Sequence, residues 1–163
     1  YEPLSCRPRL TKALSDLTHP VPAFFIFNIL MTATHWPGVV DLFMPTQLGS
    51  FALNAAWMLG GLIFWWPVIS PVPERPGFHA LGKIAYLALN AFLIRPPFAM
   101  MIFSESPIYE IYELAPPPAQ DALNDQQFAG AVMKIGSAWI MFAGVLVIFR
   151  NWMLSESDRP DSA

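Results

Sequence analysis

The stretch LGSFALNAAWMLGGLIFWWPVIS, residues 48–70, decides the fold class of this chain. It lies in a longer interval, between Asp41 and Glu74, that contains no Asp, Glu, Lys or Arg. At about 1.5 Å of rise per residue, a helix of this length crosses about 30 Å of hydrocarbon. We therefore predict a transmembrane helix here.

Three other apolar segments extend this prediction to a bundle. Residues 128–149 are a second long span, and residues 84–103 are a third, which Pro96-Pro97 should kink or break because prolines lack the N–H donor. Residues 21–34 are shorter than an ordinary span, so they suit either a span or a re-entrant or interfacial segment. The expected fold is all-α, a polytopic membrane protein with a bundle of about four transmembrane helices.

The composition excludes several classes of protein. Apolar residues make up 55% of the chain and charged residues only 13%, against about 25% charged residues in a soluble domain. The net charge of −3 and the absence of basic runs argue against a nucleic-acid partner. Cys6 is the single cysteine, so no disulfide forms within the chain. The sequence contains no nucleophile elbow, phosphate loop, zinc-binding histidine pair or dinucleotide fingerprint, and we expect no enzymatic activity.

The positions of the basic residues predict the orientation. With four spans, one side of the membrane carries Arg7, Arg9, Lys12, Arg75, Lys83, Arg150 and Arg159. The charged residues of the two loops on the other side are all acidic. Because Lys and Arg accumulate in cytoplasmic loops, we expect both termini in the cytoplasm. The expected organisation is a cytoplasmic segment at 1–16, a four-helix membrane domain at 17–152 and a disordered cytoplasmic tail at 153–163.

A candidate copper site lies at the outer end of the first span. His35 stands there, and Met31, four residues earlier, shares its helix face. The outer ends of the other spans add Met44, Met100, Met101 and Met133. Imidazole and thioether together suit Cu(I), so we single out His35, Met31 and Met44 as candidate ligands. In the alternative interpretation, the methionines fill gaps in helix packing and His35 forms a hydrogen bond at the interface.

Two cations inside the spans form a second candidate site. Arg95 and Lys134 lie at a similar depth, about 13 Å below the outer surface at helical rise, and the spans contain no acidic residue. They either reach up to Asp125 or Glu105, or face the bundle interior and bind a partner or an anion such as a lipid phosphate or a haem propionate.

Several short motifs occur in a characteristic order. They are Thr18-His19-Pro20, His35-Trp36-Pro37 with Asp41, Phe64-Trp65-Trp66-Pro67, Ser106-Pro107-Ile108-Tyr109 and Asp125-Gln126-Gln127. In this order and spacing, the chain resembles the multi-span CtaG-like family of cytochrome c oxidase assembly factors. Members of that family usually have more spans, so the resemblance implies the later part of the domain without its N-terminal spans, or a shortened relative.

The resemblance implies a chaperone-like role in supplying copper to a haem-copper oxidase, or in maturing it otherwise, at the outer face of a bacterial plasma membrane. The implied partners are oxidase subunits or another membrane complex, besides membrane lipid. The matching positions are Pro37, Asp41, Trp65, Trp66, Pro67, Asp125, Gln126 and Gln127.

One departure from the family leaves the function open. Where the family carries a His-x-x-Glu-His pattern before Phe-Trp-Trp-Pro, this chain has Ser50, Leu53 and Asn54. If His35 and the methionines suffice, a weaker Cu(I) site survives, with Asp125 as the acceptor that orients the imidazole. Otherwise the chain is a structural subunit or scaffold that has lost metal binding, or a small transporter whose path is lined by the polar residues inside the spans.

Overall fold

The computed structural model describes residues 12, 15–69, 78–93, 96–113 and 121–157, and this part of the chain folds into helices without any strand. The helices are α2 (Pro20–Thr34), α3 (Pro37–Phe43), α4 (Gln47–Ile69), α5 (Ala80–Phe92), α6 (Pro96–Phe103), α7 (Glu110–Glu113) and α8 (Ala122–Ser157). Three segments are long and apolar enough to cross a membrane: α4, α5 with α6, and α8. The bent pair of α2 and α3 counts as a fourth if it is one span. The prediction of an all-α polytopic membrane protein is confirmed.

A proline produces the bend between α2 and α3. Trp36 precedes Pro37 and has extended backbone angles, φ −68° and ψ 133°, because the proline ring disfavours helical geometry in the residue before it. Pro37 then takes the first position of α3, where its missing N–H costs nothing. The two helices meet at 68°. The segment at 21–34 is therefore the first arm of a broken element.

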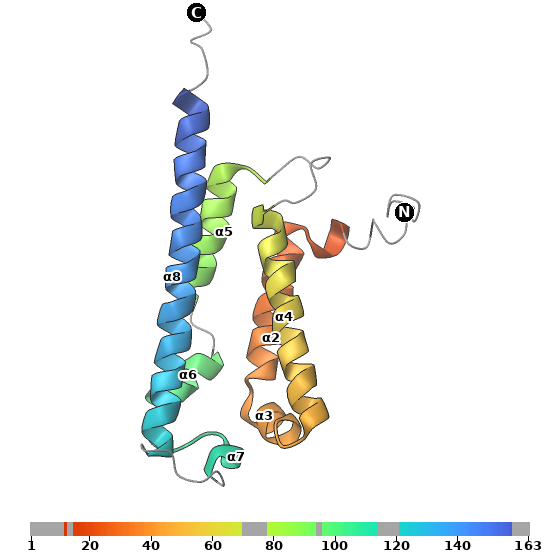
Figure 1. Ribbon diagram of the computed structural model, residues 1–163, viewed down its shortest axis with the longest axis vertical. Helices are drawn as coiled ribbons and strands as arrows, with labels where there is room; N and C mark the ends of the chain where they lie inside the picture. Colours follow the sequence, from red (N-terminus) through yellow and green to blue (C-terminus); the bar gives the residue numbers. More distant parts are fainter. Residues whose placement is uncertain (1–11, 13–14, 70–77, 94–95, 114–120, 158–163) are drawn as a thin grey trace, which may run out of the picture.

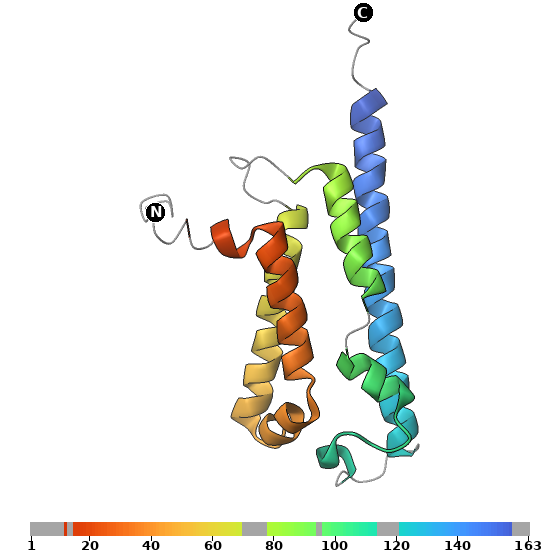
Figure 2. The same cartoon turned by 180° about the vertical axis from the view of Figure 1, so that it is seen from behind.

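The helices form two antiparallel hairpins that stand side by side (Figures 1 and 2). In one hairpin α2 packs along α4, and in the other α5 and α6 both pack along α8. Side-chain hydrogen bonds join the hairpins: the Tyr86 hydroxyl donates to the Phe64 carbonyl over 3.0 Å, and Asn28 Nδ2 donates to Asn90 Oδ1 over 3.1 Å. Such bonds help to hold helices together in a membrane, because the hydrophobic effect does not drive one helix against another in lipid.

Charge divides the bundle into two ends. The acidic end is formed by α3, α7 and the start of α8, which carry Asp41, Glu110 and Asp125 (bottom of Figure 1). The basic end is formed by the last turn of α4, the start of α5 and the last turns of α8, which carry Lys83 and Arg150 and one acid, Glu156. Each end has its own buried apolar cluster, around Phe64 and Leu87 toward the basic end and around Val40, Phe98 and Met101 at the acidic end.

The last helix is longer than expected. α8 runs to Ser157, past the boundary that we expected at residue 152. Within these last turns the hydroxyls of Ser155 and Ser157 donate to the carbonyls of Trp152 and Met153. Residues 153–157 are thus helical and not disordered. The rest of the expected tail, 158–163, and most of the segment at 1–16 lie outside the described residues.

Candidate functional site

A cavity of about 350 Å³ lies at the acidic end, between the two hairpins. Residues from the end of α2 to α8 contribute to its wall. The lining side chains of types that can ligate a metal are His35, Met44, Met101, Asp125 and Met133. His35 and Met44 are the C-cap residues of α2 and α3, Met101 belongs to α6, and Asp125 and Met133 belong to α8. Tertiary packing therefore brings most of the candidate ligands together.

His35 is held rigidly at the edge of this cavity. It is only 8% exposed, and its ring stacks on Trp57 with centroids 5.0 Å apart and meets the edge of Phe98 at 5.3 Å. Its Nδ1 lies 2.8 Å from the carbonyl oxygen of Met31, and a carbonyl can only accept. Nδ1 therefore carries the proton, and the lone pair of the neutral ring is on Nε2, the tautomer typical of a metal-ligating histidine.

Met31 meets His35 through its backbone, because its carbonyl oxygen lies 2.8 Å from Nδ1 of the ring. Met31 is not among the residues that line the cavity, and neither is Met100, although Met101 is. The structure therefore supports Met44 and does not support Met31 as a neighbour of the site.

The donor set of the cavity fits a soft monovalent metal. It offers one imidazole and three thioethers, which suit Cu(I), whereas zinc, magnesium and calcium prefer nitrogen, thiolate or several carboxylates. Within the described residues there is no group of three or more His, Cys, Asp and Glu side chains that could hold a metal ion. The thioethers are therefore the most numerous soft donors among the described residues that line the cavity.

The segment at 104–113 forms a strap across the acidic end. The Tyr109 hydroxyl donates to the His35 carbonyl over 2.9 Å, and Asp41 Oδ1 accepts from the backbone N–H of Ile111 over 3.2 Å. From α8, Gln126 Oε1 accepts from the N–H of Ile108 over 2.7 Å, and Gln127 Nε2 donates to the Ser104 carbonyl over 2.9 Å. These bonds tie the strap to both hairpins.

The two tyrosines of the strap lie in an environment that disfavours negative charge. Burial, together with Tyr112 and the carboxylate of Asp41, raises the pKa of Tyr109 to about 12. Burial and Asp41 also raise the pKa of Tyr112. Both phenols therefore stay protonated at physiological pH, and Tyr109 keeps the O–H that it donates to His35.

Comparison with known proteins identifies the family. The family model of the cytochrome c oxidase caa3 assembly factor matches residues 3–155. This chain belongs to the family of cytochrome c oxidase caa3 assembly factors. The resemblance drawn from the short motifs is thereby confirmed. Searches of curated proteins and of solved structures find no match.

In this assembly factor, the motif residues at the acidic end hold the strap in place. Asp41, Gln126 and Gln127 each bond to strap backbone, and Pro37 produces the bend that brings α3 beneath the strap. Asp125 lines the same cavity as His35, whose Nδ1 lies 2.8 Å from the Met31 carbonyl oxygen. That Asp125 orients the imidazole stays a prediction.

The Trp65-Trp66-Pro67 motif lies at the other end of the assembly factor. Trp65 packs against the apolar cluster around Phe64, Pro67 is buried, and Trp66 is half exposed. Pro67 stands in the last turns of α4, where its missing N–H weakens the helix shortly before it ends at Ile69. This motif terminates a helix, and none of its residues lines the cavity at the acidic end.

The positions where the family carries its His-x-x-Glu-His pattern form no ligand group here. Asn54 is exposed and its Nδ2 donates to the Ser50 carbonyl over 2.8 Å, while Leu53 is buried. None of the three residues lines the cavity. The amide of Asn54 is thus used within its own helix.

Lys134 has a partner that the sequence did not indicate. Its Nζ donates to the carbonyls of Ala91 and Leu93 over 2.6 Å and 3.1 Å, at the end of α5. These bonds use two of the three N–H donors of Lys134. That Lys134 also reaches an acidic residue or binds an anion stays a prediction. Arg95 lies outside the described residues.

Sequence reasoning missed Trp57 and Tyr109 as partners of His35. Trp57 stacks on its ring and also donates from Nε1 to Thr34 Oγ1 over 2.8 Å. The sequence signal for both is weak: Trp57 follows Leu53 by four residues and so shares its helix face, and Tyr109 belongs to the Ser106-Pro107-Ile108-Tyr109 motif.

Proposed function

We propose that this assembly factor binds Cu(I) in the cavity at the acidic end and thereby handles copper for a haem-copper oxidase. The observation that carries the proposal is the convergence of His35 with Met44, Met101 and Met133 on one cavity of about 350 Å³. In this proposal the lone pair of His35 Nε2 and the thioether sulfurs are the ligands. Cu(I) is stabilised by such soft donors.

The chain's own residues would prepare this site. The bond from Nδ1 to the Met31 carbonyl selects the tautomer, and Trp57 and Phe98 fix the plane of the ring. The strap carries Tyr109 and Tyr112 over the cavity, which limits the access of water and of oxidants. In this proposal Cu(I) is the cargo that the assembly factor carries, and not a resident cofactor.

The proposed orientation puts this cavity at the outer face of a bacterial plasma membrane, with the termini in the cytoplasm. The separation of charge supports it, because Lys83 and Arg150 belong to one end and Asp41, Glu110 and Asp125 to the other. Oxidase subunits docked at the acidic end would then meet the cavity and its strap. A non-catalytic role agrees with the assembly function for which the family is named.

A scaffold function without copper is the second candidate. It is favoured by the use of Asp41, Gln126 and Gln127 for hydrogen bonds to the strap, since these family-motif residues then need no metal to explain them. A transporter is less well supported. Asn28 bonds to Asn90, and Lys134 bonds to carbonyls, so these polar residues contribute to helix packing.

An anaerobic Cu(I) titration against a competing chelator tests the copper proposal. The purified protein in detergent is compared with Met101→Leu/Met133→Leu, which removes two thioethers while nearly conserving side-chain volume. We expect the affinity to fall about tenfold or more, equivalent to about 1.4 kcal/mol. Met100→Leu is the matched control, because Met100 adjoins Met101 but does not line the cavity.

His35→Ala and His35→Gln complete the experiment. Loss of stoichiometric binding in His35→Gln, with helicity by circular dichroism unchanged, supports the imidazole as a ligand. Absence of Cu(I) binding by the wild-type protein, or equal affinity in wild type and the double methionine variant, would overturn the copper proposal and leave the scaffold.

A further inference from the structure

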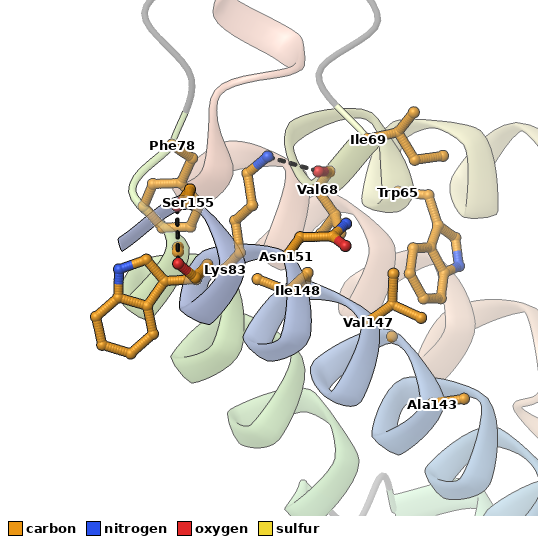
Figure 3. Close-up of a pocket in the computed structure, with 13 residues that line it drawn as sticks. Trp65, Val68, Ile69, Phe78, Lys83, Ala143, Val147, Ile148, Asn151 and Ser155 are labelled. Carbon is orange, nitrogen blue, oxygen red and sulfur yellow. Dashed lines mark hydrogen bonds between the residues drawn. The ribbon is translucent and has the colours of Figure 1, made fainter. Parts of the chain in front are cut away.

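A second and larger cavity lies at the basic end, on the opposite side of the bundle from the proposed copper site. Its volume is about 670 Å³, within the range of about 300–1,000 Å³ that is usual for small-molecule sites. Figure 3 shows that Trp65 and Val68 of α4, Lys83 of α5, and Val147, Ile148 and Asn151 of α8 surround it.

The unequal lengths of the helices create the cavity. Trp65 reaches α8 at Gly144, where an added Cβ would lie 3.4 Å from the Trp65 ring. Beyond this contact α4 ends at Ile69, whereas α8 continues to Ser157. Val147 and Ile148 of α8 therefore lie across the cavity from the last turn of α4.

Lys83, Asn151 and Ser155 are the polar side chains of a mainly apolar wall, and the Ser155 hydroxyl donates to the Trp152 carbonyl. Lys83 Nζ donates to the Val68 carbonyl over 2.8 Å, and an ammonium group has three N–H donors, so two remain for another acceptor. Asn151 also lines the cavity, and its amide lies on the α8 side facing Val68 (Figure 3). Its side chain forms no hydrogen bond to the rest of the described chain. A cation and an amide donor thus stand beside an apolar surface.

We propose that this cavity binds one anionic phospholipid, with the phosphate at Lys83 and Asn151 and an acyl chain against Trp65, Val68 and Val147. The charge of Lys83 complements the negative headgroup, and basic pockets between helices near the membrane surface are suited to such headgroups. The apolar walls require a ligand with a hydrocarbon chain, which a free phosphate ion lacks. This inference is independent of copper binding.

Native mass spectrometry of the detergent-purified protein provides the test. The protein is mixed with phosphatidylglycerol and phosphatidylcholine of identical acyl chains, and the bound lipid is counted for each. We expect about fivefold preference for phosphatidylglycerol, and loss of this preference in Lys83→Gln. The matched control is Arg150→Gln: Arg150 is an exposed cation of the same end but does not line the cavity, so the preference should persist.

A second variant addresses the fold and the other occupants. Val147→Trp fills the cavity and leaves Lys83 in place, so binding of both lipids should fall severalfold while helicity is retained. Three outcomes would overturn the proposal. The wild type would bind the two lipids equally, or Arg150→Gln would lose the preference for phosphatidylglycerol as fully as Lys83→Gln, or Val147→Trp would bind phosphatidylglycerol as well as the wild type does. A lipid-independent dimer that Val147→Trp dissociates would also overturn it, because the cavity would then belong to a second copy of the chain.

Discussion

Lys134 of α8 donates a hydrogen bond of 3.1 Å to the carbonyl of Leu93, the residue that caps the C-terminus of α5. In a continuous helix this carbonyl would accept from the N–H of residue 97, which is a proline and has none. The ammonium group supplies the missing donor. It also bonds to Ala91 and stands at the negative end of the α5 dipole. The break in the third span and the cation in the last span are therefore two parts of one structure.

Replacing Lys134 should destabilise the bundle at this break. Lys134→Met leaves the carbonyls of Ala91 and Leu93 without this donor in an apolar environment, and we expect a loss of about 1–3 kcal/mol in the free energy of unfolding. Lys134→Gln keeps one donor group and should lose less. Denaturant unfolding in detergent measures both. Equal stability of Lys134→Met and wild type would contradict this role of the ammonium group.

The buried phenol of Tyr109 predicts a decline in stability at alkaline pH. Its pKa is about 12 in the folded protein and about 10 in the unfolded chain, so folding favours the protonated form. Below pH 10 both states are protonated and the contribution is complete. Between pH 10 and 12 the unfolded state loses the proton first, and stability falls as the pH rises. Thermal unfolding midpoints of wild type and Tyr109→Phe should therefore differ in their slope over this range.

At neutral pH the same variant reports on the strap. Tyr109→Phe removes the hydrogen bond to the His35 carbonyl, and we expect it to cost about 0.5–1.5 kcal/mol. An identical alkaline slope in both proteins would show that Tyr109 is not the titrating group.

Asp41 should secure the strap through its oxygen and not through its charge. Asp41→Asn retains Oδ1 and its bond from the Ile111 N–H, whereas Asp41→Ala removes the acceptor. Hydrogen exchange at Ile111 should accelerate severalfold in Asp41→Ala and change little in Asp41→Asn. The charge has a separate effect: Asp41→Asn should lower the alkaline titration midpoints of Tyr109 and Tyr112, because the carboxylate raises both pKa values.

Two glycines of α4 should respond oppositely to alanine. A Cβ at Gly49 would collide with the backbone carbonyl of Phe43, where α3 turns back into α4, and relief requires a backbone shift. We expect Gly49→Ala to cost about 1–3 kcal/mol. At Gly61 an added Cβ meets nothing within 4 Å, so Gly61→Ala should be neutral or stabilising by up to about 1 kcal/mol. Thermal unfolding in detergent compares them, and equal effects would refute the close approach.

The sequence by itself determined the properties that depend on local backbone chemistry and on solvation. The apolar run at 48–70 became α4 almost at its expected bounds, Pro37 ended α2, and Pro96-Pro97 separated α5 from α6. These outcomes follow from the length of hydrocarbon to be crossed and from the missing N–H and fixed φ of proline. These properties depend only on which residues follow one another in the chain.

Only the tertiary structure decided which side chains meet. α8 is apolar on nearly all sides, so its hydrophobic pattern favours no face, and nothing in it indicates that Lys134 turns to Leu93 or that Met133 turns to the cavity of His35. Those contacts depend on how two hairpins dock, and therefore on packing and on hydrogen bonds such as Tyr86 to Phe64 and Asn28 to Asn90. Such interactions join residues that are distant in the sequence, and no local pattern encodes their partners.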